Sequence, residues 1–198
     1  MKLYSHPASP FGRKCKIVAL ELGIKLEIVV VQARDDEALR KINPLKKIPI
    51  LVLDDGSALF DSRVICEYLN DSGSGKFFPG MNLFSHHTNR WKSLTLHALA
   101  DGVMDAAVAC RYESIQPAEK QNADFIARYR RTIGAGLDAL ERVKLSDPPT
   151  IGEIATGCAL GYLDFRYPDI AWRDTHPGLA AWYAKFSEFP SMKATVPG

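Results

Sequence analysis

A predicted β-hairpin that runs directly into a helix, within residues 43–69, constrains the fold of this chain more than any other segment. Residues 50–53 are a run of strand formers, and residues 54–57 (Asp-Asp-Gly-Ser) have the composition of a turn. The short apolar run 58–60 supplies the returning strand of the hairpin. A helix then begins at residues 61–62, because apolar residues recur at helical spacing from there.

The preceding residues predict a β-α-β unit. Residues 2–5 are expected to form a strand and residues 10–22 a helix, and residues 26–31 are apolar on both faces, as in a central or parallel strand. A strand, a crossover helix and a strand in about 30 residues form such a unit. With a short helix near 35–42 and the hairpin, the order is β-α-β-α-β-β-α. This is the thioredoxin-like pattern, and it covers residues 1–72.

Beyond this domain the pattern is wholly helical. Residues 71–76 (Asp-Ser-Gly-Ser-Gly-Lys) change composition abruptly, and we expect a linker over residues 73–84. One predicted helix runs from about Trp91 to about Tyr112. The sequence therefore predicts an α/β domain followed by an all-α helical-bundle domain over residues 85–198.

A capping box opens a later helix at Thr150. The threonine hydroxyl would bond the third amide of the helix, and Glu153 would bond back to the capping residue. The preceding helix carries the apolar stripe of residues 125–140, and Pro148-Pro149 is expected to end it. This part of the pattern specifies folding rather than chemistry.

Composition excludes several classes of function. The 198 residues are 46% hydrophobic and 24% charged, which is ordinary for a globular protein, and a net charge of +2 does not predict nucleic-acid binding. No segment approaches the roughly 18 consecutive apolar residues of a membrane span. The chain begins with a strand-like sequence instead of a secretory signal. We therefore expect a cytoplasmic protein with no nucleic-acid or membrane partner.

The cysteines and histidines do not form a metal site. The cysteines lie far apart, with no C-x-x-C spacing and within apolar helical patterns, so we expect them to be buried, reduced thiols. They are Cys15, Cys66, Cys110 and Cys158. His86 and His87 are adjacent and would point in different directions on a helix. No metal and no cofactor are predicted.

Two ordered motifs suggest a ligand. They are N-P-L-x-K-I-P-x-L at residues 43–51 and D-S-x-x-I-x-E-Y-L at residues 61–69. The strand edge at Ile48 can pair with a peptide-like ligand, and the helix N-terminus at Ser62 can bind a carboxylate. Asp61 can take an ammonium group. The alternative is that Asp61 and Ser62 only cap the helix.

Together these motifs resemble the glutathione-binding half of the cytosolic glutathione transferases, in particular bacterial, serine-type, theta- or zeta-like members. The capping box, A-L-G-Y-L-D-F, H-P-G-L-x-x-W and F-P-S-M resemble their helical domain, so the likeness spans almost the whole chain. The resemblance implies a glutathione-binding thioredoxin-like domain, a helical domain that contributes the electrophile site, and a homodimer. It also implies a cis Pro49.

The resemblance assigns six glutathione contacts. They are Phe11, Lys47, Ile48, Pro49, Asp61 and Ser62. Lys47 would reach the carboxylate of the ligand's glycine end, with a free surface lysine as the alternative. Family members usually carry glycine where Lys46 stands, which puts the local turn geometry in question.

The catalytic prediction concerns Ser9. Where thioredoxin-like redox proteins carry C-P-x-C, residues 9–12 of this chain read Ser-Pro-Phe-Gly, so the chain cannot run its own dithiol exchange there. The Ser9 hydroxyl precedes a helix N-terminus and could donate to a bound glutathione thiolate. Two alternatives stay open: Ser9 is only a helix cap, or Ser5 is the partner of the sulfur. Arg13 and Lys14 are expected to be solvated or to pair along the helix.

The helical domain supplies further candidates by resemblance. Asp101 would contact the γ-glutamyl ammonium from the neighbouring subunit, although a hydrated helix-face acid is the better-supported interpretation for it and for Asp105. The electrophile would lie near Arg111 and Tyr112, with Trp172 also considered; Tyr112 and Trp172 could equally be core residues. The dimer faces would be the Asn70 side of the first domain and the helix that carries Trp91.

Three functions are compatible with the sequence. The first is an enzyme that conjugates glutathione to a small apolar electrophile. The second is a non-catalytic binding or stress-related regulatory protein with the same fold, which would not need the set formed by Ser9, Ile48-Pro49 and Asp61-Ser62. The third, a glutathione-dependent reductase or peroxidase, is disfavoured because Ser9 stands where a cysteine would form the mixed disulfide.

Overall fold

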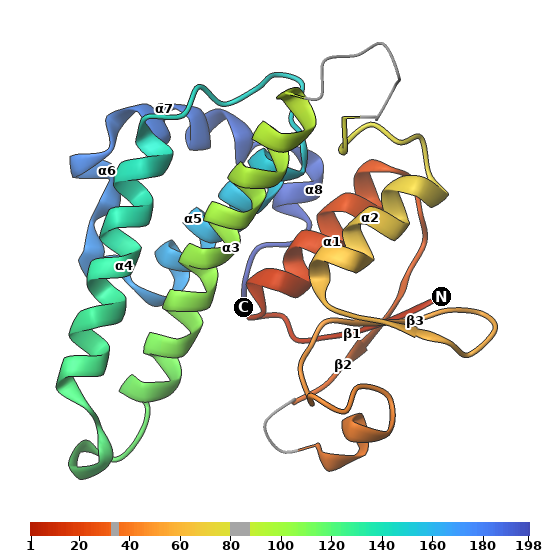
Figure 1. The fold of residues 1–198 in the computed structure, drawn as a ribbon, viewed down its shortest axis with the longest axis horizontal. Coiled ribbons are helices and arrows are strands. Elements are labelled where there is room, and N and C mark those ends of the chain that lie inside the picture. Colours follow the sequence, from red (N-terminus) through yellow and green to blue (C-terminus); the bar gives the residue numbers. More distant parts are fainter. Residues whose placement is uncertain (33–35, 80–87) are drawn as a thin grey trace. The chain divides into compact units, whose positions relative to one another are not determined.

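The computed structural model describes residues 1–32, 36–79 and 88–198, which form two compact units. The first is Met1–Arg90 together with Phe189–Gly198, and the second is Trp91–Glu188. The predicted order of a thioredoxin-like domain and a helical domain is confirmed (Figure 1). The linker over residues 73–84 stays a prediction, since residues 80–84 lie outside the described part. His86 and His87 lie outside it too.

The first unit is built on a mixed four-stranded sheet. Its elements are β1 (Lys2–Ser5), α1 (Pro10–Glu21), β2 (Glu27–Val30), η1 (Glu37–Lys41), β3 (Ile50–Val52), β4 (Ala58–Leu59), α2 (Ser62–Ser72) and α8 (Pro190–Lys193). The strand order is β2-β1-β3-β4, with β1 parallel to β2 and the other pairs antiparallel. Helices α1 and α2 cover one face of the sheet, and η1 covers the other (Figure 1).

Strand β2 is parallel to β1, as predicted, but it lies at the sheet edge rather than in the centre. Its apolar residues therefore stay accessible: Ile28 is 43% exposed and Val30 is 61% exposed. A run that is apolar on both faces is typical of a covered strand, whereas among the described residues no strand pairs with the outer side of β2.

The helical unit surrounds one central helix. The elements of this part of the chain are α3 (Thr88–Ser114), η2 (Ala118–Lys120), α4 (Ala123–Glu141), α5 (Ile151–Arg166), η3 (Pro168–Ile170), α6 (Trp172–Thr175) and α7 (Pro177–Phe186). Every residue of α5 from Ile151 to Leu163 is buried. The predicted capping box is confirmed: the Thr150 hydroxyl accepts from the Gly152 amide at 3.2 Å, and the Thr150 amide donates to Glu153 at 2.8 Å. Helix α4 ends at Glu141, seven residues earlier than Pro148.

The chain returns to the first unit through α8. Arg13 on α1 donates from Nη2 to the Met192 carbonyl at 3.1 Å and from Nε to the Thr195 hydroxyl at 3.3 Å. Arg13 is 3% exposed and Lys14 is fully buried, so the expectation that they are solvated is wrong. For Arg13, the physical reason is that its acceptors come from a segment about 180 residues away in sequence.

Within the described residues, no helix is long and apolar enough to cross a membrane.

Candidate functional site

The register of the sheet brings the predicted ligand-binding segments to one edge. Tyr4 of β1 is paired with Ile50 of β3, and Leu51 of β3 is paired with Leu59 of β4. Continuing both antiparallel registers places residues 48–49 beside the chain that leaves β1, and residue 61 beside residue 49. Consistent with this, the side chains of Ile48 and Phe60 pack against the same core cluster. The loop after β1, the Ile48-Pro49 pair and the start of α2 therefore meet.

Ser9 caps α1 and keeps its own proton available. Its Oγ accepts a hydrogen bond from the Gly12 amide at 3.1 Å, with Pro10 in the first helical position. As the acceptor in that bond, the hydroxyl can still donate, and no residue in the described part of the chain accepts from it. The capping role and the predicted role as a donor to sulfur are thus compatible.

Ser5, the competing candidate, is packed inside. It is 1% exposed, and its Oγ lies 3.5 Å from the His6 carbonyl oxygen. The same Oγ lies so close to α1 that a Cβ on Gly12 would stand 1.9 Å from it. Ser9 is only half-buried, so the geometry favours Ser9 over Ser5 as the group that meets a ligand.

The backbone at Ile48 lies in a loop that a cis peptide bond and Asn43 shape. The Ile48–Pro49 peptide bond is cis, in agreement with the prediction. Among residues 1–32, 36–79 and 88–198, no backbone group pairs with the N–H or C=O of Ile48. Asn43, 1% exposed, holds the loop before it: its Nδ2 donates to the Lys47 carbonyl at 2.9 Å, and its Oδ1 accepts from the Leu45 amide at 3.0 Å. Sequence reasoning missed Asn43, although Asn-Pro is a turn signal.

The lysine at the usual glycine position keeps the left-handed turn. Lys46 has a φ of 53°, a conformation that favours glycine. Its Nζ donates to Glu37, and hydrogen bonds from Lys46 and Arg40 lower the pKa of the Glu37 carboxyl. The Lys47 side chain, the predicted partner of a carboxylate, is exposed. The substitution therefore changes the residue without abolishing the turn.

The N-terminus of α2 carries the predicted acid and hydroxyl. Asp61 is exposed and caps the helix, because its Oδ1 accepts from the Arg63 amide at 2.9 Å. Ser62 is 2% exposed, and its carbonyl accepts from the Cys15 thiol of α1 at 3.9 Å. This contact places the start of α2 against α1. Phe11, in the first turn of α1, is half-buried, and the Lys14 Nζ lies 6.0 Å from its ring centroid.

All four cysteines are buried and stand outside any disulfide, as predicted. Cys15 and Cys66 lie between α1 and α2, with 3.8 Å between their sulfur atoms. They are part of the contact between these two helices, and both are fully buried. The described residues contain no group of three or more His, Cys, Asp or Glu side chains that could hold a metal ion.

In the helical unit, Asp101 is not a hydrated helix-face acid. It is 2% exposed, and its Oδ2 lies 3.4 Å from Nε2 of His97, which is also buried. The expectation of a hydrated acid is wrong for Asp101 because the face of α3 that carries it is covered. It holds for Asp105, which is exposed. The cross-subunit contact of Asp101 stays a prediction.

The candidates for the electrophile site differ in exposure. Tyr112 is 51% exposed, so it is not a core residue, and Arg111 is half-buried in the last turn of α3. Trp172 is 2% exposed, and its Nε1 donates to Asp164 at 2.8 Å. Trp172 is therefore a core residue, whereas Arg111 and Tyr112 remain accessible to a ligand.

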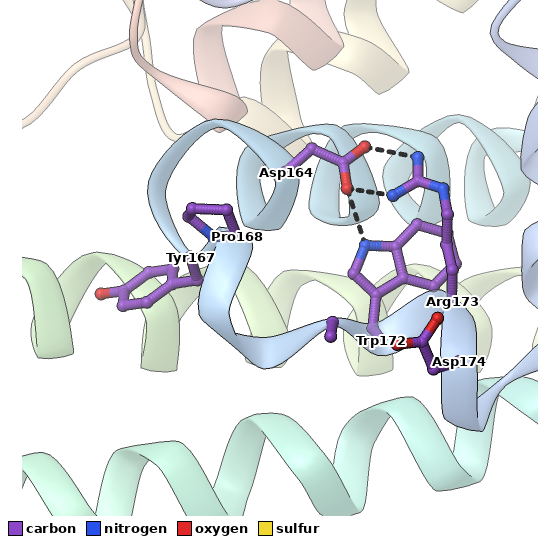
Figure 2. Close-up of a pocket in the computed structure, with 7 residues that line it drawn as sticks. Asp164, Tyr167, Pro168, Trp172, Arg173 and Asp174 are labelled. Carbon is purple, nitrogen blue, oxygen red and sulfur yellow. Dashed lines mark hydrogen bonds and ion pairs between the residues drawn. The ribbon is translucent and has the colours of Figure 1, made fainter.

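One pocket of about 370 Å³ lies in the helical unit (Figure 2). Its lining is Asp164, Tyr167, Pro168, Ala171, Trp172, Arg173 and Asp174. Figure 2 shows Asp164 turned toward Arg173 and Trp172, and Arg173 Nη2 donates to Asp164 at 2.8 Å. The hydrogen bonding of Arg173 to the Asp164 carboxylate, which accepts from it, raises the pKa of Arg173. The polar groups that line this pocket thus largely bond to one another. None of the predicted glutathione contacts lines the pocket.

Comparison with known proteins agrees with this geometry. The family model for the glutathione S-transferase N-terminal domain matches residues 3–76, and that for the C-terminal domain matches residues 123–185. The uncharacterized GST-like protein YibF of Escherichia coli K12 is 33% identical over 100% of this chain and 98% of its own length. A glutathione transferase family member from Pseudomonas fluorescens Pf-5, solved with bound glutathione, is 42% identical with a TM-score of 0.90, covering 100% of this chain and 98% of its own. A glutathione S-transferase from Methylobacillus flagellatus KT, also with glutathione bound, is 36% identical with a TM-score of 0.91, covering 100% and 99%. The chain belongs to the glutathione S-transferase family.

Proposed function

We propose that this protein is a glutathione transferase that joins the sulfur of reduced glutathione to a small hydrophobic electrophile. The observation that carries the proposal is the meeting of three features at one sheet edge. They are the capping hydroxyl of Ser9, the backbone of Ile48, which has no backbone partner in the described residues, and the N-terminus of α2 with Asp61. The two relatives solved with glutathione support the choice of ligand.

Each part of the ligand has a partner of suitable chemistry. The backbone of Ile48 pairs with the peptide backbone of the cysteine in glutathione, as a strand edge pairs with a peptide. The amides at the start of α2 bind the γ-glutamyl carboxylate, and Asp61 binds its ammonium group. Lys47 attracts the glycine carboxylate. These contacts hold the ligand at its charged ends and leave the sulfur near α1.

Ser9 then stabilises the thiolate. Its hydroxyl donates to the sulfur while the positive end of α1 favours the negative charge, so the pKa of the bound thiol falls. Each pKa unit corresponds to about 1.4 kcal/mol of preference for the thiolate. The thiolate attacks the electrophilic carbon, a C–S bond forms, and the leaving group departs with its electron pair. The serine is a donor and not a nucleophile.

Retention on glutathione resin, followed by turnover of a model aryl chloride, tests the proposal. We expect elution by free glutathione and release of chloride that depends on glutathione. Binding without turnover of any electrophile would instead support the non-catalytic alternative, a binding or stress-related protein with the same fold. The Ser9 hydroxyl with no acceptor in the described residues favours the enzyme, because a scaffold does not need it.

The finer classification follows from the same residues. We assign the chain to the bacterial, serine-type, theta- or zeta-like group on Ser9, and infer a cytoplasmic detoxification enzyme that works as a homodimer. Trp91, on the proposed dimer face, is 59% exposed in the single chain. Asn70 is internal, since it is 3% exposed and its Oδ1 accepts from the Phe77 amide at 2.9 Å. Sedimentation at micromolar concentration should give twice the monomer mass of 21.9 kDa.

A further inference from the structure

A buried guanidinium in the first turn of α1 has no acidic partner. Arg13 is 3% exposed, and its amide donates to the Ser9 carbonyl at 2.9 Å, so it lies one helical turn after the cap. Within residues 1–32, 36–79 and 88–198, no Asp or Glu carboxylate pairs with it. Burial of a charge without a counter-charge costs free energy, so this arginine calls for an explanation.

The groups that bind Arg13 are neutral. Its Nε donates to the Thr195 hydroxyl at 3.3 Å, and its Nη2 donates to the Met192 carbonyl at 3.1 Å. Its Nη1 is buried and finds no acceptor in the described residues. A guanidinium has five N–H donors, and these neutral acceptors orient it without cancelling its charge.

The segments around Arg13 keep acids away from it. Residues 189–198, which supply its acceptors, contain no Asp or Glu. Helix α1 contains one acid, Glu21, which lies at the opposite end of the helix and pairs with a lysine at 3.5 Å. On α2, Glu67 pairs with Arg90 at 2.6 Å. None of these carboxylates neutralises Arg13.

The other charged groups at this end of the first unit are mostly cations. The His6 Nδ1 accepts from the Ala8 amide at 3.1 Å, so it carries no proton there. Asp61 caps α2 and, in the proposed function, faces the ammonium group of the ligand. Over residues 10–16, 62–65 and 190–193, all charged side chains are cations: Arg13, Lys14, Lys16, Arg63 and Lys193.

We propose that Arg13 is a positioning residue whose uncompensated charge stabilises the glutathione thiolate at Ser9. Four residues of helix span about 6 Å, so the charge lies on the order of 10 Å from a sulfur bound at Ser9. At an effective dielectric constant of about 20, that separation lowers the pKa of the thiol by about one unit. This inference rests on the proposed function, and every group in it belongs to the first unit.

Titration of the bound thiol tests the inference without turnover. The ultraviolet absorbance of the thiolate is followed across pH with glutathione bound, and S-methylglutathione, which has no thiol proton, gives the baseline. We expect the thiol in the wild type to titrate below free glutathione. Arg13→Met removes the charge and should raise the pKa of the bound thiol by about one unit, whereas Arg13→Lys should keep most of the lowering.

A second pair of variants changes the charge and leaves the arginine in place. Thr195→Asp puts a carboxylate beside the guanidinium and should raise the pKa of the bound thiol about as much as Arg13→Met does. Thr195→Asn has nearly the same shape without the charge and should raise it much less. This pair decides the question even if Arg13→Met does not fold. Lys25→Met removes an exposed cation of the same unit and is the control, with no shift expected.

Two results with a wild type that binds glutathione would overturn the inference and leave glutathione binding intact. The first is a bound thiol that titrates like free glutathione, or whose pKa stays lowered in both Arg13→Met and Thr195→Asp. The second is an equal shift in Thr195→Asp and Thr195→Asn, because charge is then not the cause. A wild type that does not bind glutathione overturns the proposed function, and the inference with it.

Discussion

The Ser5 hydroxyl oxygen occupies the space that a side chain on Gly12 would need, since a Cβ there would lie 1.9 Å from it. Gly12→Ala should therefore destabilise the protein by about 1–3 kcal/mol, the usual cost of overpacking, despite the better helix propensity of alanine. Urea unfolding of the variant measures this loss.

A double variant and a matched control isolate the cause. Ser5→Ala in the Gly12→Ala background removes the clashing oxygen and should recover most of the loss. Gly134→Ala on α4 meets no atom within 4 Å and should stabilise by about 0.5–1 kcal/mol. Equal destabilisation at both glycines would show that the close approach of Ser5 is not responsible.

The Ser9 hydroxyl is expected to matter for rate more than for binding. Ser9→Ala should lower kcat with a model electrophile 10- to 100-fold, equivalent to roughly 1.4–2.8 kcal/mol, and shift the pH–rate profile upward. The dissociation constant of glutathione should change much less, because the charged ends hold the ligand. Steady-state kinetics across pH and calorimetry give the two quantities.

The capping role of Ser9 needs its own control. Ser9→Ala also loses the cap on the Gly12 amide, about 1 kcal/mol of stability, whereas glycine caps almost as well as serine. Ser9→Gly should thus be as slow as Ser9→Ala but more stable, and Ser9→Thr should keep both properties. A fast Ser9→Gly enzyme would reduce Ser9 to a cap.

Removing the charge of Asp61 should weaken glutathione binding without unfolding α2. Asparagine caps helices as well as aspartate does, so Asp61→Asn keeps the bond to the Arg63 amide and loses only the charge that faces the ligand ammonium. We expect a 10-fold or greater rise in the dissociation constant, about 1.4 kcal/mol or more. Asp36→Asn, at the cap of η1, is the matched control and should bind as the wild type does. Unchanged affinity in Asp61→Asn would remove the ammonium contact.

Tyr167 should make the protein sensitive to alkali. Burial, with a hydrogen bond involving Cys110, raises the pKa of Tyr167 far above its ordinary value of 10. Because the folded pKa is the higher one, the stabilisation is complete below about pH 10 and is lost as pH rises above it. Chemical unfolding at pH 8 and pH 11 should show this fall in the wild type, and a smaller fall in Tyr167→Phe.

At pH 8 the same variant should be less stable by about 1 kcal/mol, since the Ala107 carbonyl loses its donor. Tyr129→Phe removes a hydroxyl that makes no hydrogen bond in the described residues, and should change stability by less than about 0.5 kcal/mol. If the two phenylalanine variants behave alike at both pH values, the Tyr167 bond contributes nothing measurable.

Local sequence rules predicted the elements and their order. The hairpin turn at residues 54–57, the cap at Asp61 and the box at Thr150 depend on side chains within a few residues of one another, so spacing reveals them. The edge position of β2 was not predicted, because neighbours in a sheet are not neighbours in the chain.

Burial of charged residues was the part that the sequence could not supply. The sequence alone predicts a solvated Arg13, because its acceptors at Met192 and Thr195 are distant in the chain. It likewise predicts a hydrated Asp101, because it does not show that the face of α3 carrying His97 and Asp101 is covered. The proposed glutathione contacts rest on the resemblance and stay predictions, and Asn43, which holds the loop before Ile48, was missed. Asn43 acts through the loop that it holds, so the local pattern marks it as a turn residue and not as part of a site.

The bonds from Arg13 to Met192 and Thr195 also set an order for folding during synthesis. The sheet, α1 and α2 leave the ribosome first, but the acceptors for this buried guanidinium arrive about 180 residues later, after the whole helical unit has been made. Until then the nascent first unit must keep Arg13 in water. The first unit therefore receives its last segment, Phe189–Gly198, only at the end of synthesis. A fragment that stops at residue 90 lacks the acceptors of Arg13 on α1.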